Sequence, residues 1–321
     1  MRANSSLRER VLTVMAAVVL LNLLAGGGAL WLGGFGAVGL SVGMIAYLLG
    51  VRHAFDADHI AAIDNVTRRL RAEGQRPAGV GLFFSLGHST VVLLLTAVAV
   101  VAAHHIGVLL PQLSDWGSLF GSLVSAVFLT LIGLANLRFF AAMLRDRHSG
   151  KEHRHGFGLG RIARNTDHSW KMFPLGMLFG LSFDTASEVA LLAISVVAAH
   201  DGRIPLLAVM MLPLLFAAGM ASMDTLQSLL MLRLYDWAIA DRDRTLRLNT
   251  LITGISVCLA LTVALHEWID LYSHQTSSVS AVWAIDSSMV GLLATVLLLG
   301  LGVLAWLRRR HQGLRIAVKD S

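Results

Sequence analysis

The strongest constraint on the fold is a series of long segments that contain no charged side chain. These segments are 11–24, 91–103, 119–136, 206–221 and 289–307. About 20 apolar residues are enough to span the hydrocarbon core of a bilayer as one helix. Only 14% of the residues are charged, against about 25% in an average soluble domain. The sequence therefore predicts an all-α polytopic membrane protein and excludes a soluble enzyme.

The alternation of apolar and basic segments predicts eight transmembrane helices in a single domain, residues 1–321. Cytoplasmic loops are enriched in Lys and Arg, and, apart from Arg52 and Arg203, the basic residues fall at the termini or beside alternate loops. Both termini are therefore expected to be cytoplasmic, with 145–171 as a polar cytoplasmic connector. The first span is retained, because no A-x-A-like cleavage site follows it. The expected spans are about 11–31, 36–66, 79–103, 117–144, 172–198, 204–233, 247–266 and 286–307.

Several classes of protein are excluded by the motifs that are missing. The basic residues separate apolar segments instead of forming a patch on a folded domain, so no nucleic-acid partner is expected. No lysine stands in a Gly-x4-Gly-Lys-Ser/Thr loop, so no nucleotide site and no ATPase subunit is evident. The lone Cys258 excludes a disulfide framework and a cysteine-based metal site. Any transport must be driven by a gradient or by another subunit.

Acidic residues inside the predicted spans are the best candidates for function. A carboxylate in a bilayer costs about 2.5–3.5 kcal/mol on insertion scales and marks a functional site by default. Arg52 can neutralise at most one carboxylate, whereas His53, His59 and His88 lie in the same zone. A divalent metal ion balances such a cluster of carboxylates and imidazoles. The acidic residues concerned are Asp56, Asp58, Asp64, Asp184, Glu188 and Asp224.

The densest stretch of these residues is RHAFDADHI at 52–60. Imidazole nitrogens and carboxylate oxygens suit Ni²⁺, Co²⁺ or Zn²⁺, whereas Cu⁺ prefers sulfur. On a regular helix, with about 100° per residue, Asp58 lies about 140° from His53. His53, Asp58 and His59 therefore meet at one ion only if the helix is distorted near Gly50; otherwise they do not all bind the ion directly. The alternative is a cluster of solvated charges at the inner end of the span.

Three further spans carry polar residues at helical spacing. In the third span, Ser85 and His88 share a stripe, and His88 is either a metal ligand or a histidine that is hydrogen-bonded between helices. In the fifth, Asp184 and Glu188 lie one turn apart and repel each other unless a cation or a proton lies between them. In the sixth, Asp224 is a candidate ligand. The predicted metal-binding residues are His53, Asp56, Asp58, His59, His88, Asp184, Glu188 and Asp224.

These motifs resemble those of the nickel/cobalt transporter family (NiCoT). The hallmark of its second span is His-x4-Asp-His, which corresponds here to His53, Asp58 and His59. The resemblance implies eight helical spans and uptake of Ni²⁺ or Co²⁺, as the transported substrate, across the bacterial cytoplasmic membrane. It implies no enzymatic activity and no permanently bound cofactor. Further motifs resemble those of the family in the same order: FFSLGHSTVV at 83–92, LSFDTASEVALL at 181–192 and GMASMDT at 219–225.

The chain departs from the family pattern at a few positions. Ser182 and Ser187 stand where Gly and Thr are usual. Leu226-Gln227-Ser228 replaces a continuation that usually holds a second Asp, which bears on selectivity or affinity more than on the fold.

Two other classes of function remain open. An intramembrane metalloprotease requires His-Glu-x-x-His, and the nearest string, which starts at His266 and Glu267, lacks the second histidine. The other class is a metal sensor that does not transport. A last pattern, FDA at 55–57 and FDT at 183–185, suggests an internal inverted repeat that relates the second and fifth spans.

Overall fold

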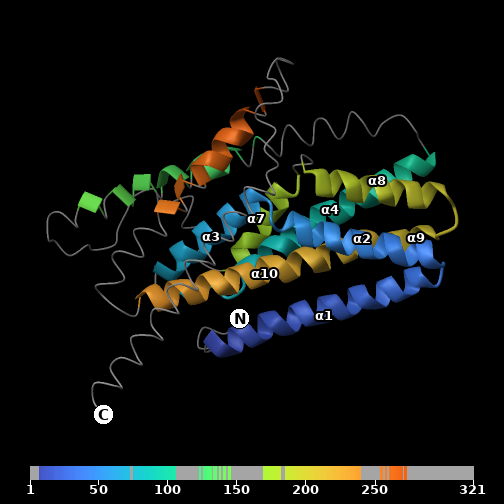
Figure 1. Cartoon of the computed structure of the whole chain (residues 1–321), viewed down its shortest axis with the longest axis horizontal. Coiled ribbons are helices and arrows are strands. Elements are labelled where there is room, and N and C mark those ends of the chain that lie inside the picture. Colours follow the sequence, from blue (N-terminus) through green and yellow to red (C-terminus); the bar gives the residue numbers. More distant parts are fainter. Residues whose placement is uncertain are drawn as a thin grey trace, which may run out of the picture.

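The structure is a computed structural model of the chain. It describes residues 7–72, 75–105, 169–181 and 185–239, together with helical positions scattered between 123 and 145 and between 254 and 272. All regular secondary structure in this part of the chain is helical. Figure 1 shows the long helices arranged as a bundle, with α10 running along α1 and α2. The predicted all-α fold is confirmed for these residues.

The N-terminal part of the bundle consists of helices joined by short connections. α1 (Leu7–Gly33) and α2 (Ala37–His53) are linked by a tight turn in which Gly36 adopts a φ of 93°, a value that glycine adopts without strain. α3 (Ala57–Ala72) follows after a short break, and α4 (Val80–His105) runs back across the bundle. The turn at Gly36 makes α1 and α2 antiparallel neighbours, and they pack against each other.

The second described part begins with a short 3₁₀ turn, η2 (Ser169–Lys171), that leads into α7 (Met172–Phe179). α8 (Ala186–His200) and the short α9 (Leu206–Val209) then precede α10 (Met211–Ile239). α10 packs against α1, α2, α3 and α4, so it forms the centre of the described bundle.

The described helices account for part of the predicted membrane region. The helices that are long and apolar enough to cross a membrane are Leu7–Gly33, Val80–Val101 and Leu206–Tyr235. α2 and α3 taken together form one further candidate. Of the predicted spans, 117–144 and 247–266 are represented only by scattered helical positions. The span 286–307 and nearly all of the connector 145–171 lie outside the described residues.

The second predicted span is broken. α2 ends at His53, Ala54 follows as its cap, and α3 begins at Ala57 after a bend of 54°. The sequence left open either a distortion near Gly50 or ligands that do not all bind the ion directly, and the structure has a break one turn after Gly50. Gly50 itself lies within the regular helix α2, directly against the backbone of Phe216 on α10.

The fifth predicted span, 172–198, is divided as well, because α7 ends at Phe179 and α8 begins only at Ala186. The motif FDA at 55–57 spans the break between α2 and α3, and FDT at 183–185 immediately precedes α8. Both interruptions therefore fall at the same short motif, which is the pattern expected of a repeat, and the repeat itself stays a prediction.

Glycines let α4 and α7 approach until their backbones touch. A Cβ added to Gly87 on α4 would lie 2.0 Å from the carbonyl oxygen of Phe173 on α7. A Cβ added to Gly176 on α7 would lie 2.0 Å from the carbonyl oxygen of Phe84 on α4. Small residues at helix crossings are typical of membrane proteins, where association depends on close van der Waals contact. The reciprocal pair fixes the register of the two helices.

α10 is held against α2 and α4 by contacts of the same kind. A Cβ on Gly219 of α10 would lie 2.3 Å from the carbonyl oxygen of Tyr47 on α2. A Cβ on Gly81 of α4 would lie 2.1 Å from the carbonyl oxygen of Asp224 on α10. Asp224 is a predicted site residue. The packing of Gly81 against its backbone therefore also helps to set the position of its carboxylate along the bundle.

α3 is a polar helix that is surrounded by protein. Every side chain from His59 to Arg68 is buried, including Asp64, Asn65 and Thr67. α1, in contrast, buries one stripe and leaves large apolar side chains exposed on its other face; Leu23 is 68% exposed and Leu30 is 78% exposed. Exposed leucines on this scale are typical of a surface that faces lipid, since soluble proteins rarely expose large apolar patches. Among the described residues, the exposed face of α1 is therefore suited to contact with lipid, whereas α3 is covered by protein.

The glycine contacts generate a prediction about stability. Gly176→Ala should lower the thermal stability of the purified protein in detergent, because the new Cβ overlaps a backbone carbonyl, and overpacking of this kind costs about 1–3 kcal/mol. Gly26→Ala on α1 is the matched control, because nothing lies within 4 Å of the new Cβ and alanine favours helix over glycine. A melting temperature that is equal for the two variants would refute the role given to close packing at Gly176.

Candidate metal centre

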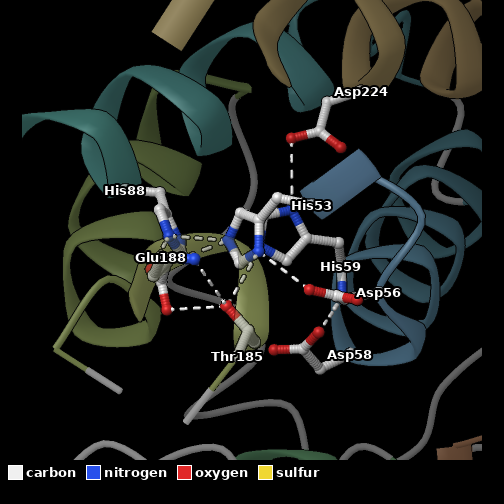
Figure 2. A network of polar contacts seen from close by, with 8 residues as sticks. All are labelled: His53, Asp56, Asp58, His59, His88, Thr185, Glu188 and Asp224. Carbon is white, nitrogen blue, oxygen red and sulfur yellow. Dashed lines mark hydrogen bonds and ion pairs between the residues drawn. The ribbon is translucent and has the colours of Figure 1, made fainter. Parts of the chain in front are cut away.

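Three buried histidines meet where the second span is broken. His53 is the last residue of α2, His59 lies in the first turn of α3, and His88 projects from α4. One ring nitrogen of each lies within 4.8 Å of the other two, and Figure 2 shows the rings converging. The side chains are at most 2% exposed. The bend of 54° is what turns His59 back towards His53, because a straight helix would direct the two rings apart.

Each histidine is contacted by a carboxylate from a different part of the chain. Asp56, in the break itself, has Oδ2 2.8 Å from Nδ1 of His53. Glu188, in the first turn of α8, has Oε1 2.8 Å from Nε2 of His88 and 3.7 Å from Nε2 of His53. Asp224 on α10 has Oδ2 3.3 Å from Nδ1 of His59.

The carboxylates determine which nitrogens face the middle of the cluster. A carboxylate oxygen lies against Nδ1 of His53 and another against Nδ1 of His59, so Nε2 of each ring is directed away from its carboxylate; in a neutral ring that donates from Nδ1, Nε2 carries the lone pair. Nε2 of His53 lies 3.0 Å from Nε2 of His88. Nε2 of His59 is buried and has no hydrogen-bond partner in the described part of the chain. Nε2 of His88 also contacts Oε1 of Glu188, and Nδ1 of His88 has no hydrogen-bond partner in the described part of the chain. The centre therefore brings imidazole nitrogens close together and leaves Nε2 of His59 unpaired, as in a site that accepts a metal ion.

Hydroxyl groups complete the polar contacts. Thr185 caps the N-terminus of α8, where its Oγ1 accepts a hydrogen bond from the backbone N–H of Glu188, donates one to Glu188 Oε2 and lies 3.2 Å from Nδ1 of His53. Ser85 on α4 donates a 2.7 Å hydrogen bond to Asp224 Oδ2. Both carboxylates are therefore held in place by a hydroxyl as well as by an imidazole.

Aromatic rings close the sides of the cluster. Phe84 on α4 meets the ring of His59 edge-on, with centroids 4.9 Å apart, and Phe216 on α10 lies 5.4 Å from the ring of His53. Both phenylalanines are fully buried. In such surroundings the effective dielectric constant is low, so interactions between the cluster and a charged ligand are stronger than in water.

Most of the predicted site residues come together. The second span contributes His53, Asp56 and His59. These residues lie together with three predicted residues of other spans, His88, Glu188 and Asp224. Asp58 does not contact the imidazole rings; its Oδ1 accepts a 2.8 Å hydrogen bond from the backbone N–H of His59, and the side chain is partly exposed. Asp184 lies outside the described residues.

Thr185 and Ser85 lie at the site but were not predicted as site residues. Thr185 stands three residues before the predicted Glu188, which is the spacing of a capping box, Thr-x-x-Glu, and a sequence signal for a helix start. That signal was available, and it places the start of α8 inside the predicted span. Ser85 lies one turn before His88 and was assigned to the polar stripe, but its bond to Asp224 depends on the packing of α4 on α10 and has no signal in the sequence.

Comparison with known proteins identifies the family. The NicO family, described as high-affinity nickel-transport proteins, matches residues 39–310. The chain is 38% identical over 312 residues to the nickel transporter NixA of Staphylococcus aureus, covering 92% of each chain. It is 42% identical over 279 residues to the cobalt transport protein NhlF of Rhodococcus rhodochrous, covering 80% of this chain and 79% of the relative.

A third relative is the nickel transporter NicT of Mycobacterium tuberculosis, which is 39% identical over 286 residues, covering 81% of this chain and 76% of the relative. No solved structure matches the chain. The chain belongs to the NicO family of high-affinity nickel-transport proteins.

Proposed function

We propose that the protein transports Ni²⁺, with Co²⁺ as a competing substrate, and that the ion binds at His53, His59 and His88. The observation that carries the proposal is the convergence of three buried imidazoles within 4.8 Å. One relative, 39% identical to this chain, is named for nickel transport, and another, 42% identical, is named for cobalt transport. The same ligand types suit both ions, and nickel is favoured over cobalt when the site imposes no geometry.

The geometry of the cluster supports direct binding by the histidines. Two nitrogens that bind one ion at about 2.1 Å and at right angles to each other lie about 3.0 Å apart. This is the separation of Nε2 of His53 and Nε2 of His88, and the ion replaces the proton that Nε2 of His88 shares with Glu188. Nε2 of His59 completes the group without having to give up a hydrogen bond. The imidazoles are therefore close to the arrangement in which they share an ion.

The carboxylates have a different role in the proposal. Asp56 and Asp224 each orient an imidazole through Nδ1, as partners of metal-binding histidines commonly do. Glu188 lies near both His53 and His88 and offsets the charge of the ion. Asp58 supports the start of α3 and with it the position of His59. A role for Asp184 stays a prediction.

The proposal includes the predicted topology. Eight spans with cytoplasmic termini place the breaks of the second and fifth spans near the middle of a bacterial cytoplasmic membrane. Broken helices with a binding site between them are common in transporters that use ion gradients. α2 with α3, and α7 with α8, are broken in this way around the histidine cluster. We infer uptake driven by a gradient, with no ATPase subunit contributed by this chain.

The first test is nickel uptake into proteoliposomes that contain only this protein. The wild-type protein should accumulate ⁶³Ni²⁺, and His53→Ala, His59→Ala and His88→Ala should each lower Ni²⁺ affinity about tenfold or more, because each removes one of few ligands. His88→Ala should be as damaging as His53→Ala, since both rings lie at the centre.

His200→Ala is the control, because His200 is an exposed histidine at the end of α8. It should leave binding and uptake unchanged. Binding without accumulation in the wild-type protein would indicate a sensor instead of a permease, and normal affinity in two of the three variants would refute the site.

The second test concerns selectivity at Gln227, where the chain departs from the family. Gln227 lies one turn beyond Asp224 and lines a cavity of about 110 Å³ beside Phe55, at the break of the second span. Gln227→Asp adds a second carboxylate on this stripe, which alters the electric field at the ion, so the Ni²⁺/Co²⁺ transport ratio should change. Gln227→Asn is the uncharged control. Equal ratios in the two variants would show that selectivity is set elsewhere.

A further inference from the structure

α3 carries a buried carboxylate, that of Asp64, outside the histidine cluster. Asp64 is 0% exposed, and it lies five residues after His59 on the same helix. At 1.5 Å of rise per residue, Asp64 is about 7.5 Å further along the helix axis. In the proposed topology this direction leads from the histidines towards the cytoplasm. Five residues also turn the helix by about 140°, so Asp64 lies on a different side of α3 from His59, against Tyr235 of α10.

The contacts of Asp64 leave one of its oxygens available. The hydroxyl of Tyr235 on α10 donates a hydrogen bond to Oδ1 of Asp64. Oδ2 is buried and has no hydrogen-bond partner in the described part of the chain. An incompletely paired carboxylate in the interior of a membrane protein is costly, and such groups commonly line ion pathways.

The neighbouring cation does not neutralise Asp64 through a direct contact. Arg68 lies one turn further along α3 and is 7% exposed. Its Nη2 donates a 2.7 Å hydrogen bond to Oδ1 of Asn65, and its Nη1 has no partner among the described residues. Because Arg68 lies one helical turn from Asp64, its positive charge lowers the affinity of the Asp64 carboxylate for a divalent ion. Weak binding suits a site from which an ion must leave quickly.

α10 presents a continuous buried stripe to this part of the bundle. Asp224, Ser228, Met231 and Tyr235 are spaced at i, i+4, i+7 and i+11, and each is at most 3% exposed. Asp224 meets His59 at one end of the stripe, and Tyr235 meets Asp64 at the other. The two ends of the stripe thus connect the histidine cluster to Asp64 along one pair of helices.

We propose that Asp64 is a second binding site for the transported divalent ion, on the cytoplasmic side of the histidine cluster, and that the Tyr235 hydroxyl holds its carboxylate when no ion is bound. The inference rests on the proposed transport function. In this scheme the ion passes from the imidazoles to Oδ2 of Asp64. Only metal–ligand bonds are exchanged, and no covalent bond of the protein is made or broken. The competing explanation is that Asp64 and Tyr235 form only a structural bridge between α3 and α10.

Two conservative variants separate these explanations. Asp64→Asn removes the charge but keeps an oxygen that accepts the Tyr235 hydrogen bond. Tyr235→Phe removes the hydrogen bond but keeps the charge. An ion site depends on the charge, and a structural bridge depends on the hydrogen bond. Asp201→Asn is the control for the substitution, because Asp201 is an exposed carboxylate that lies 3.3 Å from the guanidinium of Arg203.

The experiment measures ⁶³Ni²⁺ uptake into proteoliposomes, equilibrium Ni²⁺ binding in detergent and thermal stability for each variant. We expect Asp64→Asn to lower uptake about tenfold or more while Ni²⁺ affinity at the histidines stays within about threefold of the wild type. Tyr235→Phe should lower uptake less than Asp64→Asn does, because the carboxylate remains. Asp201→Asn should not change any of the three quantities.

Each other outcome overturns the inference. Normal uptake by Asp64→Asn excludes a site on the pathway. A loss of affinity equal to the loss of uptake places Asp64 in the histidine site itself, and equal losses of uptake and stability in both variants establish a structural bridge. Absence of uptake by the wild-type protein refutes the proposed function and the inference together, whereas wild-type uptake with a fully active Asp64→Asn refutes the inference alone.

Discussion

The contact of helix backbones at glycines sets the spacing of α2, α4, α7 and α10, and three of these helices carry site residues. Gly87 and Gly176 join α4 to α7, and Gly50 and Gly219 join α2 to α10. Without side chains between them, the helices come close enough for short polar side chains to reach across from one to another. The 2.7 Å hydrogen bond from Ser85 on α4 to Asp224 on α10 lies beside such a contact, at Gly81. In lipid, no hydrophobic effect between helices would enforce such an approach.

The arrangement of charge in the cluster follows from the same constraint. Asp56, Glu188 and Asp224 come from a helix break, a helix start and the middle of a helix. Each lies against a histidine, so none of the three depends on water for a partner. A buried carboxylate that is hydrogen-bonded to an imidazole is much less costly than an isolated one. The cluster can therefore exist in an apolar bundle and still respond to a divalent ion.

Much of the site could be predicted from the sequence, because a charged or imidazole side chain inside an apolar segment is conspicuous. This reasoning identified His53, His88 and Asp224, which the structure brings into one cluster. It could not locate the helix break, because no glycine or proline stands between His53 and Ala57 to mark it. Asp58 was predicted to bind the ion; its Oδ1 accepts a hydrogen bond from the backbone N–H of His59, and its role as a ligand stays a prediction. The all-helical class was predictable from the lengths of the apolar segments alone.

The burial of α3 has a consequence for the biogenesis of the protein. This helix carries Asp64 and Arg68 in its interior positions, so a nascent chain that ends soon after α3 holds a segment too polar to be stable in lipid by itself. The helices that cover α3, among them α4 and α10, are synthesised later. α3 must therefore remain near the translocon or the membrane surface until its neighbours arrive. Assembly of the cluster is thus one of the last steps in folding, and it awaits the synthesis of α10.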